Sequence, residues 1–316
     1  MWFLIHLGVF SFVEGLVAIS LNASIIIINV KSLKGGWKRT PSDLIHVAMG
    51  MVNISLRGLL LGHFVGLWLS TSYITMAFSV TVIPLPFLMY YTFWLTAWLC
   101  GYYCTSITNF SHRFFPWMKR WLTNVLPYLL MFSGVGSLVI SIPGIWTLRM
   151  KIQEQHLGNG SFIFTSVVIV STSIEYTVVS NVLGCSVPFM VILISLITSV
   201  SSLLRHICSI KLNNPHSLHP KLQPHVNAIG TMVLLLTLSG IFYTAEIILF
   251  YTQSLSDTRI VVCWCVIFVF PTIEAIIMIQ ASPKLRKTFQ EAICPSKLME
   301  NAKNLGTFNL TQQAKH

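Results

Sequence analysis

Apolar residues gather in seven long runs along this chain, and mostly short polar segments separate the runs. Each run reaches roughly 20 residues or more, which is the length a helix needs to cross a bilayer. The pattern therefore predicts an all-α integral membrane protein, a bundle of seven transmembrane helices. We place these helices at residues 3–30, 43–69, 81–107, 125–147, 181–206, 227–251 and 259–281.

After the seventh run the pattern changes, because cations alternate with apolar residues over 283–293. We predict that this amphipathic segment lies along the inner leaflet. Residues 1–293 then form one seven-helix domain, and residues 294–316 form a cytoplasmic tail. No internal repeat is visible, and the only long connection between helices is 148–180.

The composition agrees with a membrane protein. Only 9% of the 316 residues are charged, whereas 54% are hydrophobic, and a soluble domain averages about 25% charged residues. A formal net charge of +11 would also suit a nucleic-acid-binding protein. In a membrane protein, however, an excess of cations marks the cytoplasmic side, so we expect a lipid bilayer as a partner and no nucleic acid.

Lys and Arg are sorted between the two sides of the predicted bundle. Sixteen of the 20 fall at one set of helix ends and connections or in the tail. Only Arg149, Lys151 and Arg259 fall on the other side, and Arg57 lies within a helix. This asymmetry predicts that the N-terminus lies outside and that the C-terminus is cytoplasmic. The 148–180 connection is then extracellular, and its Asn159-Gly160-Ser161 triplet is a candidate glycosylation site.

The sequence carries no pattern typical of an enzyme or a metal site. Neither His-Glu-x-x-His nor Gly-x-Ser-x-Gly occurs, and the seven cysteines form no Cys-x-x-Cys pair. We therefore expect no catalytic residues, no metal and no cofactor. A transporter is an alternative class, but many transporters are built from repeats, and this chain has none.

Four ionisable residues lie within the apolar runs, namely Glu14, Arg57, Glu246 and Glu274. Placing an ionisable side chain in the apolar part of the bilayer costs free energy, so these side chains should face the bundle interior. From the helical rise, Glu14 lies about 24 Å and Arg57 about 21 Å from the inner ends of their helices. These depths predict an ion pair between Glu14 and Arg57. The alternative is that one of them extends outward or points into a wet pocket.

A second group of polar residues has a shared depth. Asn22, Asn53 and Glu274 lie roughly 10 to 15 Å above the cytoplasmic boundary by the same rise. We expect them to form one hydrogen-bonded cluster that joins helices 1, 2 and 7.

Residues 93–119 combine an apolar, aromatic helix end with a polar turn and a segment that mixes aromatic residues and cations. This stretch resembles the end of the third helix and the second cytoplasmic loop of the bitter taste receptors, the type 2 taste receptors. The matching positions are Trp94, Leu99, Tyr103, Ile107, Asn109, Phe110, Ser111, His112, Phe115, Trp117 and Lys119.

The resemblance extends over most of helices 1 to 7, with three notable departures. Ser106 stands where the family has a lysine, and Asn53 stands where it has a helix 2 arginine. Glu274 and Ala275 replace a His-Ser pair of helix 7. The predicted cluster of Asn22, Asn53 and Glu274 would then replace the network that the family builds with those residues.

The resemblance implies a plasma-membrane G-protein-coupled receptor for small apolar or amphipathic bitter compounds, which activates a heterotrimeric G protein of the gustducin/transducin type. Register with the family puts Leu85, Met89, Phe242 and Trp264 on the ligand pocket wall, with Glu246 one turn above Phe242. Two alternatives stay open. Phe242 and Trp264 are also typical of core packing, and Glu246 either pairs with a cationic agonist or reaches the headgroups.

On the cytoplasmic side, the resemblance implies a G-protein-facing surface that includes Tyr103, Asn109, His112, His206 and Lys284. The alternative is that these side chains only anchor helix ends at the membrane interface. A vomeronasal type 1-like pheromone receptor is the nearest other assignment, and the Asn-Phe-Ser-His stretch argues against it. The sequence leaves open whether the chain oligomerises.

Overall fold

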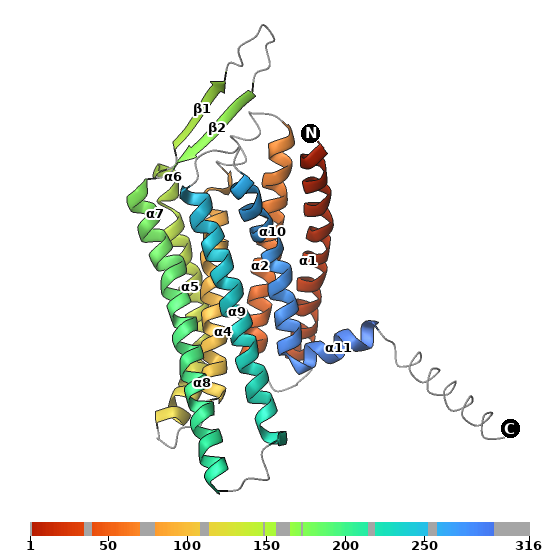
Figure 1. The fold of residues 1–316 in the computed structure, drawn as a ribbon, viewed down its shortest axis with the longest axis vertical. Helices are drawn as coiled ribbons and strands as arrows, with labels where there is room; N and C mark the ends of the chain where they lie inside the picture. The colour runs from red at the N-terminus through yellow and green to blue at the C-terminus, as the bar shows by residue number, and fades with distance from the viewer. Residues whose placement is uncertain are drawn as a thin grey trace, which may run out of the picture.

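The computed structural model describes residues 2–34, 40–69, 80–107, 114–147, 149–155, 165–171, 173–213, 219–251 and 258–293. In these ranges long helices run side by side as an elongated bundle (Figure 1). The helix α1 begins at one end of the bundle, and the short helix α11 lies at the other. The long helices are α1 (Trp2–Lys34), α2 (Pro41–Leu69), α4 (Pro84–Ile107), α5 (Phe114–Ser141), α8 (Val187–Asn213), α9 (His219–Tyr251) and α10 (Thr258–Ala281).

Helix α4 is the central element of the bundle. It packs against α2, α5, α8 and α9, and 12 of its 24 residues are buried. It begins at Pro84, where a proline costs nothing because the first N–H of a helix has no intrahelical partner. A helix of this length spans about 36 Å, which is enough to cross a bilayer.

Six segments of the described chain are long and apolar enough to cross a membrane: Gly8–Lys31, Pro41–Gly62, Asn124–Thr147, Ile174–Arg205, His225–Leu249 and Val262–Ala281. The predicted third span, α4, is not among them. Its many Tyr, Trp and Thr residues lower its hydropathy. A helix surrounded by other helices needs less apolar surface than a helix that faces lipid on most sides.

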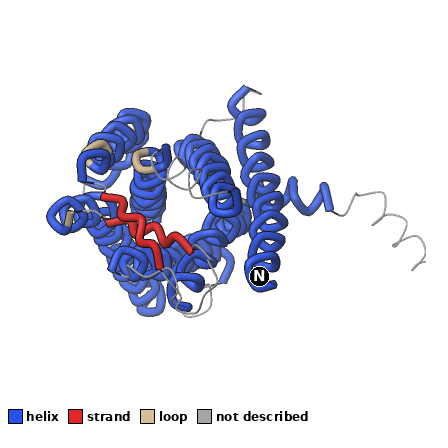
Figure 2. The backbone as a smooth tube through the Cα atoms, turned by 90° about the horizontal axis from the view of Figure 1, so that it is seen from above, coloured by secondary structure: helices blue, strands red, loops and turns tan. Residues whose placement is uncertain are grey.

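The described bundle is all-helical as predicted, but the long connection after α5 adds a pair of strands. After the short helix α6 (Gly144–Thr147), strands β1 (Arg149–Gln155) and β2 (Thr165–Ser171) form an antiparallel pair, with Arg149 opposite Ser171 and Gln155 opposite Thr165. The hairpin stands at the end of the bundle where α1 begins (Figure 1), and seen from above it crosses the ends of the helices (Figure 2).

Several predicted helix boundaries were wrong by more than a few residues. Helix α5 already begins at Phe114, α9 begins at His219, and the helical segment predicted to begin at 181 begins at Ile174. The extensions of α5 and α9 are polar, aromatic or proline-containing ends beyond the apolar runs, whereas residues 174–180 lie within an apolar segment. Hydropathy detects only the part of a helix that faces lipid, whereas the hydrogen-bonded helix continues past it.

The segment before α8 is not a regular α-helix. Ser173 caps α7 (Ile174–Asn181), because its hydroxyl oxygen accepts a hydrogen bond from the N–H of Tyr176 at 3.3 Å. A π-helical turn, η1 (Val182–Ser186), then leads directly into α8. Finally, α11 spans Pro283–Ile293, the residues of the predicted amphipathic segment.

Candidate functional site

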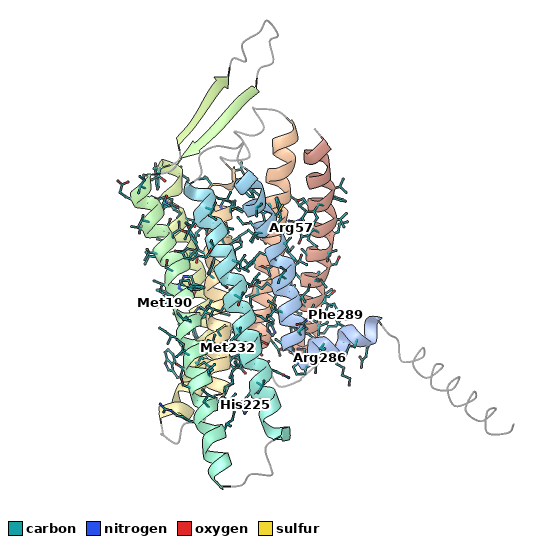
Figure 3. All side chains as sticks on the ribbon, in the orientation of Figure 1. Arg57, Met190, His225, Met232, Arg286 and Phe289 are labelled. Carbon is teal, nitrogen blue, oxygen red and sulfur yellow. The ribbon has the colours of Figure 1, made fainter. Side chains whose placement is uncertain are left out.

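Arg57 of α2 is completely buried within the bundle (Figure 3). It forms an ion pair with Glu14 of α1, and its Nη1 donates to the carbonyl oxygen of Phe268 of α10 at 3.3 Å. Its guanidinium carbon also lies 4.9 Å from the centre of the Phe268 ring, a cation–π distance. The structure thus brings together the two residues for which the sequence predicted a pair.

Further hydrogen bonds connect this ion pair to its surroundings. Arg57 Nη2 donates to the backbone carbonyl of Ser11, and the hydroxyl of Thr272 donates to the Glu14 carboxylate. Gly15 provides the space, because a Cβ atom at this position would come 3.0 Å from Arg57 Nε. The cluster therefore joins α1, α2 and α10, and sequence reasoning had not foreseen Ser11, Gly15 or Thr272.

The second predicted cluster is also assembled in the structure. Asn53 Nδ2 donates to Glu274 Oε2 at 2.8 Å and to Asn22 Oδ1 at 3.2 Å. Thr96 of α4, which the sequence analysis did not include, donates to Glu274 Oε1 at 3.0 Å. All four side chains are at most 1% exposed. The cluster therefore connects four of the long helices, α1, α2, α4 and α10.

The apolar residues proposed for the ligand pocket are buried or partly buried. Phe242 is 1% exposed, and its ring centre lies 4.3 Å from that of Phe270 and 5.7 Å from that of Phe93. Met89 is buried as well, whereas Leu85 and Trp264 are partly buried against the same core. Phe242 therefore has the surroundings of a core aromatic residue, the alternative that its spacing had left open.

Glu246 points toward neighbouring helices rather than away from the bundle. Its Oε2 accepts a hydrogen bond from the Cys185 thiol of η1 at 3.3 Å. One turn before Glu246 on α9, the Tyr243 hydroxyl is hydrogen-bonded to that of Ser186 at 2.7 Å. Two polar contacts thus connect η1 with α9 in the half of the bundle opposite α11. No sequence pattern signals these two contacts, because a π-helical turn changes which side chains face α9.

Gly184, in the middle of η1, allows a close contact with α4. A Cβ atom at this position would come 2.4 Å from Cγ and Cδ1 of the Tyr90 ring. Tyr90 is itself only 4% exposed. The π-helical turn therefore rests directly on α4 at Gly184, and the next two residues, Cys185 and Ser186, make the contacts with α9.

At the other end of the bundle, α11 is attached to α2. Lys284 Nζ lies 3.1 Å from Asp43 Oδ1, and Leu285 is completely buried. Helix α2 begins at Pro41, two residues before the predicted start, and Asp43 lies in its first turn. The Asp43 carboxylate accepts a hydrogen bond from Lys284, a contact between residues 241 positions apart.

The remaining predicted cytoplasmic residues are described only in part. Tyr103 is partly buried, with its ring centre 6.1 Å from that of Tyr102. His206 belongs to α8, and its side chain is outside the described part of the structure. Asn109, His112 and the glycosylation candidate Asn159 lie outside the described residues altogether, as does the tail 294–316.

The Asp43–Lys284 contact permits a first prediction. Replacing Lys284 with alanine should lower the free energy of unfolding by less than about 1 kcal/mol, because partly exposed ion pairs contribute little. Thermal unfolding of the purified protein in detergent measures this change. Lys287→Ala is the matched control, since its pair with Glu291 is longer, at 3.9 Å, and more exposed. A loss of several kcal/mol in Lys284→Ala would contradict the prediction.

Comparison with known proteins identifies the family. The family model described as taste receptor protein (TAS2R) matches residues 3–297. The chain is 28% identical over 253 residues to taste receptor type 2 member 9 of Papio hamadryas, which covers 78% of this chain and 80% of the relative. It is 26% identical over 261 residues to taste receptor type 2 member 41 of Rattus norvegicus, which covers 80% of this chain and 83% of the relative.

The chain therefore belongs to the taste receptor family TAS2R. This family consists of multi-pass membrane receptors of the G-protein-coupled class rather than enzymes. The resemblance inferred from residues 93–119 is thus confirmed, and the vomeronasal and transporter alternatives are not favoured.

Proposed function

We propose that this chain is a plasma-membrane bitter taste receptor with seven transmembrane helices, an extracellular N-terminus and a cytoplasmic C-terminus. The distribution of charge supports this orientation. Lys31, Arg205 and Lys284 lie in helix segments at the α11 end of the bundle, whereas Arg259 is at the opposite end. Cations concentrate on the cytoplasmic side of membrane proteins. Asn159 would then lie outside the cell, as glycosylation requires.

The agonist site that we propose lies in the outer half of the bundle, among α4, η1, α9 and α10. The observation that carries it is the pair of polar contacts Cys185–Glu246 and Ser186–Tyr243, which offer directional groups in the same half of the bundle as the apolar residues Leu85, Met89 and Trp264. Ligand sites of membrane receptors and other proteins typically combine an apolar lining with a few polar groups. Small apolar or amphipathic bitter compounds fit such a site, and Phe242 would support it from the core.

On the cytoplasmic side, the receptor would activate a heterotrimeric G protein of the gustducin/transducin type. An agonist that binds one arrangement of the helices more tightly shifts the population toward it. Tyr103, Asn109, His112, His206 and Lys284 are the residues that we propose for the surface facing the G protein. For Lys284, the contact with Asp43 supports a role in positioning α11.

Calcium mobilisation tests the proposal. Cells that express the intact chain with a promiscuous G protein carrying a gustducin tail would be exposed to a panel of bitter compounds. Saturable responses that depend on the chain are expected. The absence of any response from a receptor detected at the cell surface would contradict the proposed function.

The same assay tests the role of Glu246. Glu246→Gln should raise the half-maximal concentration of cationic agonists by about 10-fold or more, because a charge-assisted contact contributes about 1.5–3 kcal/mol. The half-maximal concentrations of neutral agonists should be the same as for the unchanged receptor. Glu291→Gln, the same substitution at an exposed position of α11, is the control. Equal effects on cationic and neutral agonists would exclude a direct contact.

A further inference from the structure

His46 of α2 is a buried histidine whose ring has no hydrogen-bond partner. The residue is 2% exposed, and neither ring nitrogen is hydrogen-bonded to any of the described residues. A neutral imidazole carries one N–H donor and one acceptor nitrogen, so both groups are unused here. A buried polar group without a partner is unfavourable. The ring can therefore form a new hydrogen bond at each of its two nitrogens.

The helices α1 and α2 place Asn29 at the level of His46. The two helices run antiparallel, and Asn53 of α2 is hydrogen-bonded to Asn22 of α1. Asn29 lies seven residues after Asn22, and His46 lies seven residues before Asn53. Seven residues are close to two full turns of a helix. Asn29 and His46 therefore occupy the same two helix faces as the bonded pair, two turns nearer to the end of the bundle at which α11 lies.

Asn29 has an unused acceptor. It is completely buried, and its Nδ2 donates to the backbone carbonyl of Ile25 at 3.0 Å. Its Oδ1, in contrast, has no partner in the described part of the chain. An amide oxygen accepts hydrogen bonds and cannot donate them. An N–H group of the His46 ring is the matching donor on the facing helix.

Two charged groups act on His46, namely Asp43, three residues earlier on α2, and Lys284 of α11. They also contact each other at 3.1 Å. The other titratable groups among the described side chains at this end of α1, α4, α10 and α11 are Lys31, Tyr102, Tyr103, Cys104, Glu274, Arg286 and Lys287. The Lys and Arg side chains of this set are exposed, and the Tyr and Cys side chains carry no charge near neutral pH. Glu274 is bonded to Asn53, two turns further along α2.

We propose that His46 is a proton-operated switch that loosens α11 from α2. When the ring binds a proton, both of its nitrogens become donors. Asn29 Oδ1 is one acceptor, and the Asp43 carboxylate is the other, because residues three apart are neighbours on a helix surface. Asp43 then leaves Lys284 for the charged ring. Partly exposed ion pairs contribute little, so the contact that Asp43 gives up is weaker than the charged hydrogen bond that it gains.

The direction of the pH effect follows from burial. While α11 is attached, the buried site disfavours a charged ring, so the attached form holds no proton on His46 and the loosened form holds one. The attached form is therefore favoured at neutral pH and is lost as the pH falls. A histidine in contact with water titrates near pH 6.5. One such proton raises the ratio of loosened to attached chains about 10-fold between pH 7.5 and pH 5.5.

In the orientation that we propose for the receptor, this proton comes from the cytosol, and the loosened end is the one that would face the G protein. The inference rests on the proposed function for this assignment alone. Proton binding and the movement of α11 are properties of the chain itself, and they are measurable without an agonist or a G protein. A negative result in such a measurement leaves the receptor function standing, and a receptor that answers no bitter compound leaves the switch standing.

Hydrogen–deuterium exchange of the full chain in detergent tests the inference. Mass spectrometry would follow exchange at pH 7.5 and pH 5.5, with labelling times scaled for the pH dependence of exchange in an unfolded peptide. Peptides from Pro283–Ile293 should lose protection about 10-fold at pH 5.5, whereas peptides from the central helix α4 should keep theirs. Unchanged protection of α11 would overturn the inference. So would an equal loss in α4, because the whole bundle would then be unfolding.

Substitutions show which group binds the proton. His46→Leu has a side chain of similar size that binds no proton, and it should abolish the pH response of α11. His225→Leu, at a partly exposed position of α9, is the matched control and should retain the full response. Should His46→Leu fail to fold, His46→Gln keeps a polar side chain without a titratable group and should abolish the response as well. A response that survives the loss of the His46 ring would overturn the inference.

Discussion

Replacing Arg57 with alanine should lower the free energy of unfolding by about 3–5 kcal/mol, the largest loss we expect from a single substitution in this chain. The change removes the ion pair with Glu14 and the hydrogen bonds to Ser11 and Phe268. More importantly, it leaves the Glu14 carboxylate in the bundle without its cation. Thermal unfolding in detergent and the amount of receptor at the cell surface would measure the effect.

A double substitution distinguishes the loss of a partner from the loss of the pair itself. When both members of a buried pair become apolar residues of similar size, the cost is much smaller than when one charge remains. Glu14→Leu combined with Arg57→Met should therefore be more stable than Arg57→Ala. A double variant less stable than either single variant would mean that the charges themselves are needed. Lys287→Ala, in an exposed pair, should change stability by less than about 0.5 kcal/mol.

The second large effect is expected at Gly184, where alanine should cost about 1–3 kcal/mol. The added Cβ would come 2.4 Å from the Tyr90 ring. The atoms it meets are at the base of the ring, and Tyr90 is 4% exposed, so the side chain has little space in which to yield. The π-helical turn or α4 would have to shift, and thermal unfolding in detergent would detect the loss.

The matched control for this prediction is Gly230→Ala in α9. No atom lies within 4 Å of a Cβ built at this position, and alanine favours a helix over glycine by roughly 1 kcal/mol. Gly230→Ala should therefore be neutral or stabilising. If Gly184→Ala behaved like Gly230→Ala, the close contact between η1 and α4 would be excluded. Combining Gly184→Ala with Tyr90→Leu, which removes the ring, should recover part of the lost stability.

Much of the bundle is predictable because the bilayer imposes simple rules. Apolar runs long enough to span the bilayer form helices. A charged side chain within the bilayer is stabilised by a polar partner at the same depth on a neighbouring helix. The rise per residue therefore predicts that Glu14 meets Arg57 and that Asn53 meets Glu274, and both contacts are present in the structure. The agreement is clearest where both partners lie well inside long helices.

Other features were not predictable, for identifiable reasons. The strand pair of 149–155 and 165–171 depends on a partner segment elsewhere in the same connection, and hydropathy carries no record of it. The π-helical turn at Val182–Ser186 shifts the facing side chains by one position, so the contacts of Cys185 and Ser186 could not be derived from a regular helix. Lys284 and Asp43 meet because α11 begins beside the first turn of α2, and no local pattern signals that two segments so far apart in the sequence lie together.

The central position of α4 has a consequence for how this protein is made. With many hydroxyl, phenol and indole groups, α4 gains less from contact with lipid tails than the other helices do. Transfer of α4 by itself from the insertion machinery into lipid is therefore less favourable than transfer of the other helices. We expect α4 to remain in the insertion machinery until α5 has been synthesised. The two helices would then enter the bilayer together and pack against α2, which is already inserted. Substitutions on α2 or α5 that weaken these contacts would then appear as receptors retained in the endoplasmic reticulum.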